Sequence, residues 1–301
     1  MRTTLRVLLP ALLFMVGCKA GPRPFPEPQE PPPEAIRIEF EPPRGRTLVE
    51  HSTVTRTKRD PEGTAHKERV EATLHSRFEP NDEGYVFTQE IPSVRVTRDG
   101  VPVESPLVQL VTGFPLRVQL AKDGAFVRLL NPEDAEAAVR KAFPKPEEAE
   151  AVLRFFTPGA LEAQARREWD SRYGELFGRN LRKGSVWYGV ETLEVGGEQH
   201  PYLVERRVEG TKPTVEGRDL VIHLGCPATV QAAADPEAAR QVLEAADIEE
   251  VRPVECDGEQ LVALNPFLPR STILEVRSGP VVFRREVRTE WANEGETREA
   301  E

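Results

Sequence analysis

The chain is poor in the residues that build metal and catalytic centres. It contains five histidines and three cysteines among 301 residues. No two histidines lie four apart on an expected helix and no two cysteines are close in sequence, so a zinc-binding spacing is absent. The sequence also lacks a Gly-x-Ser-x-Gly elbow and an acidic loop with EF-hand spacing. We therefore expect no metal site, no cofactor and no catalytic residues, and we expect that the protein is not an enzyme.

An excess of positive charge is also missing. Forty Lys and Arg residues stand against fifty Asp and Glu residues, which gives a formal net charge of −10. Nucleic acid and anionic lipid head groups are bound through basic patches, so this balance argues against both as partners of the folded body. Local basic pairs such as Arg166-Arg167 and Arg284-Arg285 are interleaved with acids, and we interpret them as solvated faces.

The N-terminal apolar run, Leu8 to Met15, is too short to span a bilayer, which takes about 20 residues. Arg2 and Arg6 precede this run, and the small residues Val16-Gly17 follow it. A charged start, a short apolar core and small residues at a cleavage point predict an export signal and not an anchor helix.

The end of this segment, Met15-Val16-Gly17-Cys18, resembles the lipobox of bacterial lipoproteins. The family pattern has Leu where this chain has Met15, and the other three positions fit. The resemblance implies that residues 1–17 are a signal peptide, that Cys18 carries a diacylglycerol, and that a fatty acid such as palmitate acylates the new amino terminus. Two or more acyl chains hold a protein stably on a membrane. An ordinary secretory signal with a chance cysteine is the alternative.

The residues after Cys18 bear on location. In the enteric sorting rule, Asp after the cysteine retains a lipoprotein in the inner membrane, so Lys19 favours the outer membrane over the inner one. Residues 18–34 then form a proline-rich tether with seven prolines. Such a segment is a stiff spacer of about 3.1 Å per residue. We expect a protein of the cell envelope, lipid-anchored and held off the membrane or reaching across part of the periplasm.

Two cysteines remain once Cys18 is assigned to lipid. Cys226 and Cys256 form an even pair in an exported chain, and exported proteins rarely keep free thiols. We predict a disulfide between them, with two buried free thiols as the alternative. Closing a loop of about 30 residues would restrict the unfolded chain by roughly 3.5 kcal/mol in the entropic account.

Alternation of apolar and polar residues dominates the rest of the chain and is clearest over Val70–Phe78. This pattern is typical of an antiparallel sheet with one wet face. The expected strands include residues 107–111 and 251–256, and Asp257-Gly258 is expected to turn the chain into the next strand.

Helical spacing predicts helices near residues 133–177 and 235–246. Blocks of strands and helices without βαβ alternation predict a single α+β domain over residues 35–292. We expect a large curved antiparallel β-sheet, a half-barrel, with helices packed on its concave face. A charged tail follows at residues 293–301.

The passage Asn180-Leu181-Arg182-Lys183-Gly184-Ser185-Val186-Trp187 resembles a Gly-Asp/Ser-x-Trp element of uncharacterised bacterial lipoproteins with a curved antiparallel sheet. The helical stretch before it and the hairpin at Val195–Gly197 are also similar. A broader resemblance is to periplasmic lipoprotein carriers and mycobacterial lipid-binding lipoproteins. These fold as unclosed β-barrels with helices in the hollow, and the resemblance implies that fold for this chain while saying little about function.

These observations favour a membrane-anchored, non-enzymatic binding module for a hydrophobic or amphipathic ligand or for another envelope protein. A ligand pocket between sheet and helices would be lined by Leu74, Phe78, Leu116, Val118, Trp169 and Phe283. The same six residues would otherwise simply fill the core. Two further alternatives remain open: a structural scaffold without a small ligand, and a hydrolase with an unrecognised carboxylate pair.

Overall fold

The structure is a computed structural model, and it describes residues 35–293 apart from positions 105, 175, 196, 197, 216 and 265. The predicted signal peptide, Cys18, the predicted tether and the part of the predicted charged tail beyond residue 293 lie outside the described residues, as do the two glycines of the expected hairpin at Val195–Gly197.

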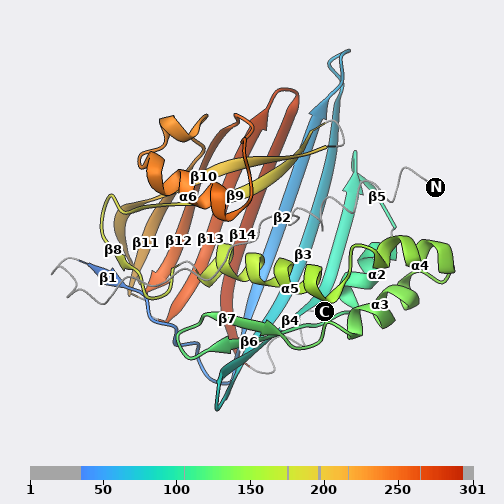
Figure 1. Cartoon of the computed structure of the whole chain (residues 1–301), viewed down its shortest axis with the longest axis horizontal. Coiled ribbons are helices and arrows are strands. Elements are labelled where there is room, and N and C mark those ends of the chain that lie inside the picture. Colours follow the sequence, from blue (N-terminus) through green and yellow to red (C-terminus); the bar gives the residue numbers. More distant parts are fainter. Residues whose placement is uncertain are drawn as a thin grey trace.

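Within the described residues, twelve antiparallel strands form one curved sheet that does not close on itself (Figure 1). The strand order is β7-β6-β4-β3-β2-β14-β13-β12-β11-β10-β9, and β5 pairs with β4. The strands are β2 (Arg46–Arg59), β3 (Ala65–Asn81), β4 (Gly84–Arg98), β5 (Val101–Pro102), β6 (Leu116–Ala121), β7 (Phe126–Leu129), β9 (Val186–Val195), β10 (Glu198–Thr214), β11 (Gly217–Gly225), β12 (Glu255–Leu264), β13 (Phe267–Ser278) and β14 (Val281–Asn293). The predicted curved antiparallel sheet is confirmed.

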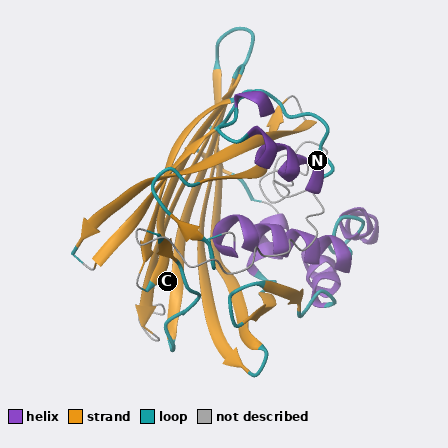
Figure 2. Cartoon of the chain, turned by 60° about the vertical axis from the view of Figure 1, so that its left-hand side comes forward, coloured by secondary structure: helices purple, strands orange, loops and turns teal. Residues whose placement is uncertain are grey.

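Helices cover the concave side of the sheet, as predicted (Figure 2). They are α2 (Pro106–Thr112), α3 (Asp134–Ala142), α4 (Pro146–Leu153), α5 (Pro158–Trp169), the π-helical turn η1 (Asp170–Gly174), the short 3-10 helix η2 (Val230–Ala232) and α6 (Pro236–Ala245). Two of these elements depart from this arrangement: α6 and η2 pack with Tyr188 and Leu203, which point to the outer side of the β9–β10 hairpin. Away from the large sheet, β1 (Ile36–Arg37) pairs with β8 (Asn180–Leu181).

Helix α5 shows how the sequence determines the local structure. Thr157 caps it by accepting a hydrogen bond from the backbone N–H of Ala160, and Pro158 occupies the first turn, where its missing N–H costs nothing. Leu161, Ala165 and Trp169 recur every fourth residue and are all buried, so the helix presents one apolar stripe to the sheet.

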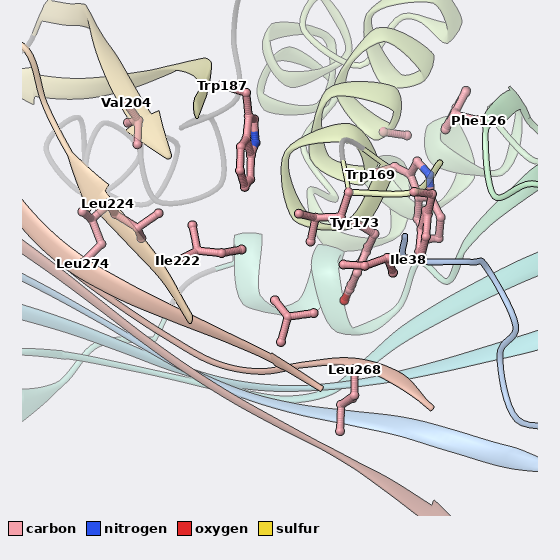
Figure 3. Close-up of a cluster of buried hydrophobic side chains, with 14 of the residues drawn as sticks. Ile38, Phe126, Trp169, Tyr173, Trp187, Val204, Ile222, Leu224, Leu268 and Leu274 are labelled. Carbon is pink, nitrogen blue, oxygen red and sulfur yellow. The ribbon is translucent and has the colours of Figure 1, made fainter. Parts of the chain in front are cut away.

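The main core lies between this stripe and the concave face. Trp169 contacts the rings of Phe78 and Phe87 from the sheet and donates its indole N–H to the carbonyl of Gly124 at 2.9 Å. Figure 3 shows Trp169 and Tyr173 extending from the helical segment toward the strands. The described helices are short, the longest being α5 with 12 residues, and none of them has the length and apolar composition needed to cross a membrane.

Three expected features of the strand pattern are wrong. The strand expected over residues 251–256 begins only at Glu255. Residues 107–111 belong to helix α2 and not to a strand. A short apolar run fits either structure by its periodicity, and here packing of α2 against β4 and α3 decides. Asp257-Gly258 makes no turn, because β12 runs through it from Glu255 to Leu264. A Cβ atom at Gly258 would lie 2.4 Å from the Ile273 carbonyl oxygen, so this glycine permits a close approach of two strands.

The disulfide between Cys226 and Cys256 is present, as the sequence predicts, with Cα atoms 5.3 Å apart. Cys226 directly follows β11 and Cys256 lies at the start of the neighbouring strand β12. The bond therefore joins the two ends of the insertion between β11 and β12, which contains η2 and α6.

Candidate functional site

A hollow of about 70 Å³ lies in the concave face of the sheet beside η1. We call it the charged hollow, because five charged side chains and one tyrosine line its wall. They are Glu50 from β2, Arg172 and Tyr173 from η1, Glu191 from β9, Arg206 from β10 and Arg285 from β14. The hollow is partly open to solvent and has room for several water molecules or for one group of carboxylate or phosphate size.

The sheet curls so that β14 and the β9–β10 hairpin, which are far apart in the strand order, both reach the hollow. Arg285 and Arg206 lie in one cross-strand row, separated by Leu274, Gly258 and Leu224. Four strand spacings would place them about 19 Å apart on a flat sheet. In the structure both approach Glu191, at 3.2 Å from Arg285 Nη2 and 3.7 Å from Arg206 Nη2 to Glu191 Oε1. The β9–β10 hairpin has therefore curled across the concave side (Figure 1).

Glu191 is the carboxylate that these two arginines share, and 18% of its side chain is exposed. Burial raises the pKa of Glu191, but the attraction of Arg285 and Arg206 and a hydrogen bond donated by the Tyr202 hydroxyl at 3.0 Å outweigh burial, so the pKa is lowered. Burial and the neighbouring Glu191 together raise the pKa of Tyr202. Glu191 is thus ionised and Tyr202 protonated at neutral pH.

The π-helical turn supplies the opposite wall. Arg172 donates a hydrogen bond to Glu50 at 2.8 Å and pairs with Glu168 at the same distance. Burial lowers the pKa of Arg172, yet the two carboxylates raise it above its ordinary value, so the guanidinium stays charged. Burial and Glu50 raise the pKa of Tyr173. Single π-helical turns are rare and are frequent at functional sites, and this one places two adjacent residues on the hollow.

Two neighbouring buried donors on the β9–β10 hairpin lack acceptors among the described residues, and one of them, on Arg206, lines the hollow. Nη1 of Arg206 has no hydrogen-bond partner, although only 6% of the residue is exposed. A Cβ atom on Gly189 would lie 2.4 Å from this nitrogen, so the glycine makes room for the guanidinium. Trp187, which pairs directly with Arg206 across β9 and β10, also has a buried and unpartnered indole N–H. Each unmet donor costs about 1–3 kcal/mol.

A second contact fastens the curled hairpin to the other half of the sheet. Arg56 on β2 donates to the backbone oxygen of Glu194 at 3.0 Å and to its side chain at 3.1 Å. Beside them, burial raises the pKa of Glu68, opposed by the nearby Arg98 and Arg56. Charged side chains therefore bridge β9 and β2, for which no backbone ladder is found within the described residues.

The six residues expected to line an apolar pocket are mostly part of the core. Phe78, Leu116, Val118, Trp169 and Phe283 pack in the main hydrophobic cluster. Leu74 is buried on β3 opposite Glu50. The space left beside Phe78 and Trp169 is about 10 Å³, roughly that of one water molecule. In this structure these side chains fill the core, and the larger space lies next to them in the charged hollow.

The interpretation of Arg284-Arg285 as a solvated face is wrong for Arg285. Arg284 is on the outer face and pairs with Glu286 at 2.7 Å. Phe283 and Val287 lie two residues before and two residues after Arg285 in β14. The three side chains therefore share one face of the strand, and Arg285 points inward with them. Arg206 is likewise in phase with the buried residues Val204 and Val208. A charge at an inward-facing position of a strand is the signal that could have identified these residues.

Other parts of the described chain offer weaker candidates. A hollow of about 250 Å³ lies near Val221, His223 and Glu259 on the outer side of the sheet. It is wide open and the His223 side chain is 46% exposed, so nothing there is desolvated. Among residues 35–293, apart from the gaps given above, no three His, Cys, Asp or Glu side chains are arranged to hold a metal ion.

The geometry of the charged hollow suits electrostatic recognition better than proton transfer. Two carboxylates, Glu50 and Glu191, line the same space, but a general acid needs a raised pKa and the pKa of Glu191 is lowered. The fold and the hollow together define an open antiparallel sheet with a charged concave site. In comparison with known proteins, the chain matches no protein-family model and no curated protein sequence.

Proposed function

We propose that this protein is a bacterial envelope lipoprotein, anchored through lipidated Cys18, whose folded body is a non-enzymatic binding module. The charged hollow is its binding site, and its ligand is an amphipathic molecule whose polar group enters the hollow. The observation that carries this proposal is the unpartnered Nη1 of the buried Arg206 beside the ion pairs of Glu191 and Arg285.

The energetics of burial support a binding role. Well-packed apolar side chains are often as stabilising as a buried ion pair or more so, and an unmet donor is a net loss. A scaffold without a ligand would use Arg206 only for its ion pair with Glu191 and would leave Nη1 without an acceptor. A ligand that accepts hydrogen bonds would convert the unmet donor into binding energy, which favours the binding module over the scaffold. Another envelope protein, inserting one polar side chain, is the second candidate occupant.

The location rests on the sequence. Val16-Gly17-Cys18 supports lipid attachment, Lys19 supports the outer membrane, and the proline-rich tether gives a reach of about 50 Å at 3.1 Å per residue. Growth with an alkyne-labelled palmitate should label the wild-type protein in the outer-membrane fraction and leave the Cys18→Ala variant unlabelled. Label on the Cys18→Ala variant, or wild-type protein in the soluble fraction, would contradict this location.

The binding role is tested by native mass spectrometry of the full chain, purified from bacterial membranes in a non-ionic detergent. We expect a one-to-one complex with a small molecule in the wild type. The complex should persist in Arg284→Gln, because Arg284 points to the outer face, and should be depleted in Arg285→Gln. A wild-type chain that carries no bound molecule in any preparation would contradict the binding role.

A further inference from the structure

We infer that the charged hollow binds an oxyanion, a carboxylate or a phosphate group, between Arg206 and Arg285. This inference rests on the proposed function, because it names the chemistry of the ligand that the hollow would hold.

The balance of charge within the hollow points to an anion, because three arginines line it against two carboxylates, Glu50 and Glu191. On one wall, Arg172 is paired with Glu50 and also with Glu168, which does not line the hollow. On the other wall, Arg206 and Arg285 share the single carboxylate of Glu191. The positive charge in excess therefore lies at the second wall, where an anion would be attracted and a cation repelled.

An unmet donor lies at the same wall. The Nη1 group of Arg206, which lines the hollow, needs an acceptor, and an oxyanion offers several acceptor oxygens with full negative charge. Hydrogen bonds between guanidinium and carboxylate or phosphate are shorter and stronger than those between neutral groups. The Arg285 side chain is 33% exposed, so part of its guanidinium remains accessible to a ligand in the hollow.

Neutral polar groups complete the floor. Ser52, Thr272 and Gln260 also line the hollow, and they lie in one cross-strand row adjacent to the row that holds Arg206 and Arg285. Their hydroxyl and amide groups can donate to a second oxygen of the anion. The volume of about 70 Å³ admits the head group alone, so the tail of an amphiphile would leave through the open side.

The inference is tested by isothermal titration calorimetry on the full chain in a non-ionic detergent at low salt. The probes are inorganic phosphate, hexanoate, hexanol and hexylammonium. We expect phosphate or hexanoate to bind one site with a Kd below about 1 mM, and hexanol and hexylammonium to bind at least tenfold more weakly. Tighter binding of hexanoate identifies the carboxylate of an amphiphile, whereas tighter binding of phosphate identifies a free or head-group phosphate.

Variants separate the hollow from the rest of the surface. Arg206→Gln and Arg285→Gln should each weaken anion binding at least tenfold, and the matched outer-face variant Arg284→Gln should leave it unchanged. Should Arg206→Gln not fold, Arg285→Gln decides the question, because its side chain is less buried. Added sodium chloride should weaken binding in the wild type.

Two results would overturn the inference, and they differ in what else they overturn. If hexanol or hexylammonium binds as tightly as hexanoate, and this binding is lost in Arg285→Gln, the hollow has no preference for anions. The proposed binding module would then remain. No binding of any of the four probes, together with no bound molecule in native mass spectrometry, removes both the anion site and the proposed function.

Discussion

Glu191 on β9 and Arg285 on β14 are five places apart in the strand order, yet Arg285 Nη2 lies 3.2 Å from Glu191 Oε1. Five strand spacings on a flat sheet amount to about 24 Å. The pair therefore exists only because the β9–β10 hairpin curls over the concave side. Arg56 and Glu194 make a second contact of this kind, so the curled shape is held by side chains as well as by the ladder.

The first prediction concerns the stability that Glu191 contributes. Glu191→Gln should lower the free energy of unfolding by about 2–3 kcal/mol, because it leaves two arginines without their shared carboxylate in a largely buried place. Glu286→Gln, on the outer face with 41% of its side chain exposed, should change it by at most about 0.5 kcal/mol. Urea unfolding of both variants measures the difference, and equal effects would show that the Glu191 contacts do not hold the curl.

The second prediction is a dependence of stability on pH. The pKa of Glu191 in the folded chain is below its ordinary value of 4.5. Its contribution is therefore complete above about pH 4.5 and is lost as the pH falls through the folded-state pKa. Urea unfolding from pH 7 down to pH 3 should show a shallower acid loss for Glu191→Gln than for the wild type. Identical acid profiles would contradict the assignment.

The third prediction uses two glycines that differ in their surroundings. Gly189→Ala places a methyl group against Arg206 Nη1, at 2.4 Å before any adjustment, whereas Gly225→Ala meets His223 Nε2 at an ordinary 3.6 Å. We expect Gly189→Ala to cost about 1–2 kcal/mol of stability, because the methyl group pushes the guanidinium away from its ion pair with Glu191. Gly225→Ala should cost less than about 0.5 kcal/mol. Thermal unfolding monitored by circular dichroism compares the two, and a larger loss in Gly225→Ala would refute the packing described.

The fourth prediction concerns the disulfide. Replacing both Cys226 and Cys256 with serine should destabilise the chain by about 2–4 kcal/mol, since the closed loop spans a sequence separation of 30. A thiol-blocking mass measurement on the wild type should show reaction at these two cysteines only after reduction. Blocking without reductant would mean that they are free thiols.

Much of the fold could be predicted from periodicity. The predicted alternation is seen in the burial of β3 over Leu74–Phe78, whereas residues 70–73 are all half-buried. The pairing of Cys226 with Cys256 could be predicted, because these two cysteines remain once Cys18 is assigned to lipid in a chain expected to be exported. The helical identity of residues 107–111 could not be predicted, because a short apolar run fits both structures and only contacts with β4 and α3 decide. Gly258 was misleading for a related reason: its function is a close strand approach that depends on a distant residue, Ile273.

The charged hollow was harder to foresee. Arg285 stands next to Arg284 in a chain with many charges, and only its phase with Phe283 distinguishes the inward residue from the outward one. The meeting of Arg206, Arg285 and Glu191 depends on how far the sheet curls. No local pattern encodes this curvature, because it arises from contacts between strands far apart in the sequence.

The central claim is that the charged hollow is a binding site, and an experimental density map of the full chain purified from bacterial membranes tests it most directly. The account predicts density larger than a water molecule within hydrogen-bond distance of Arg206 Nη1 and Arg285. A map in which Arg206 Nη1 bonds to a protein group, and the space beside Glu191 is closed or holds water alone, would contradict it.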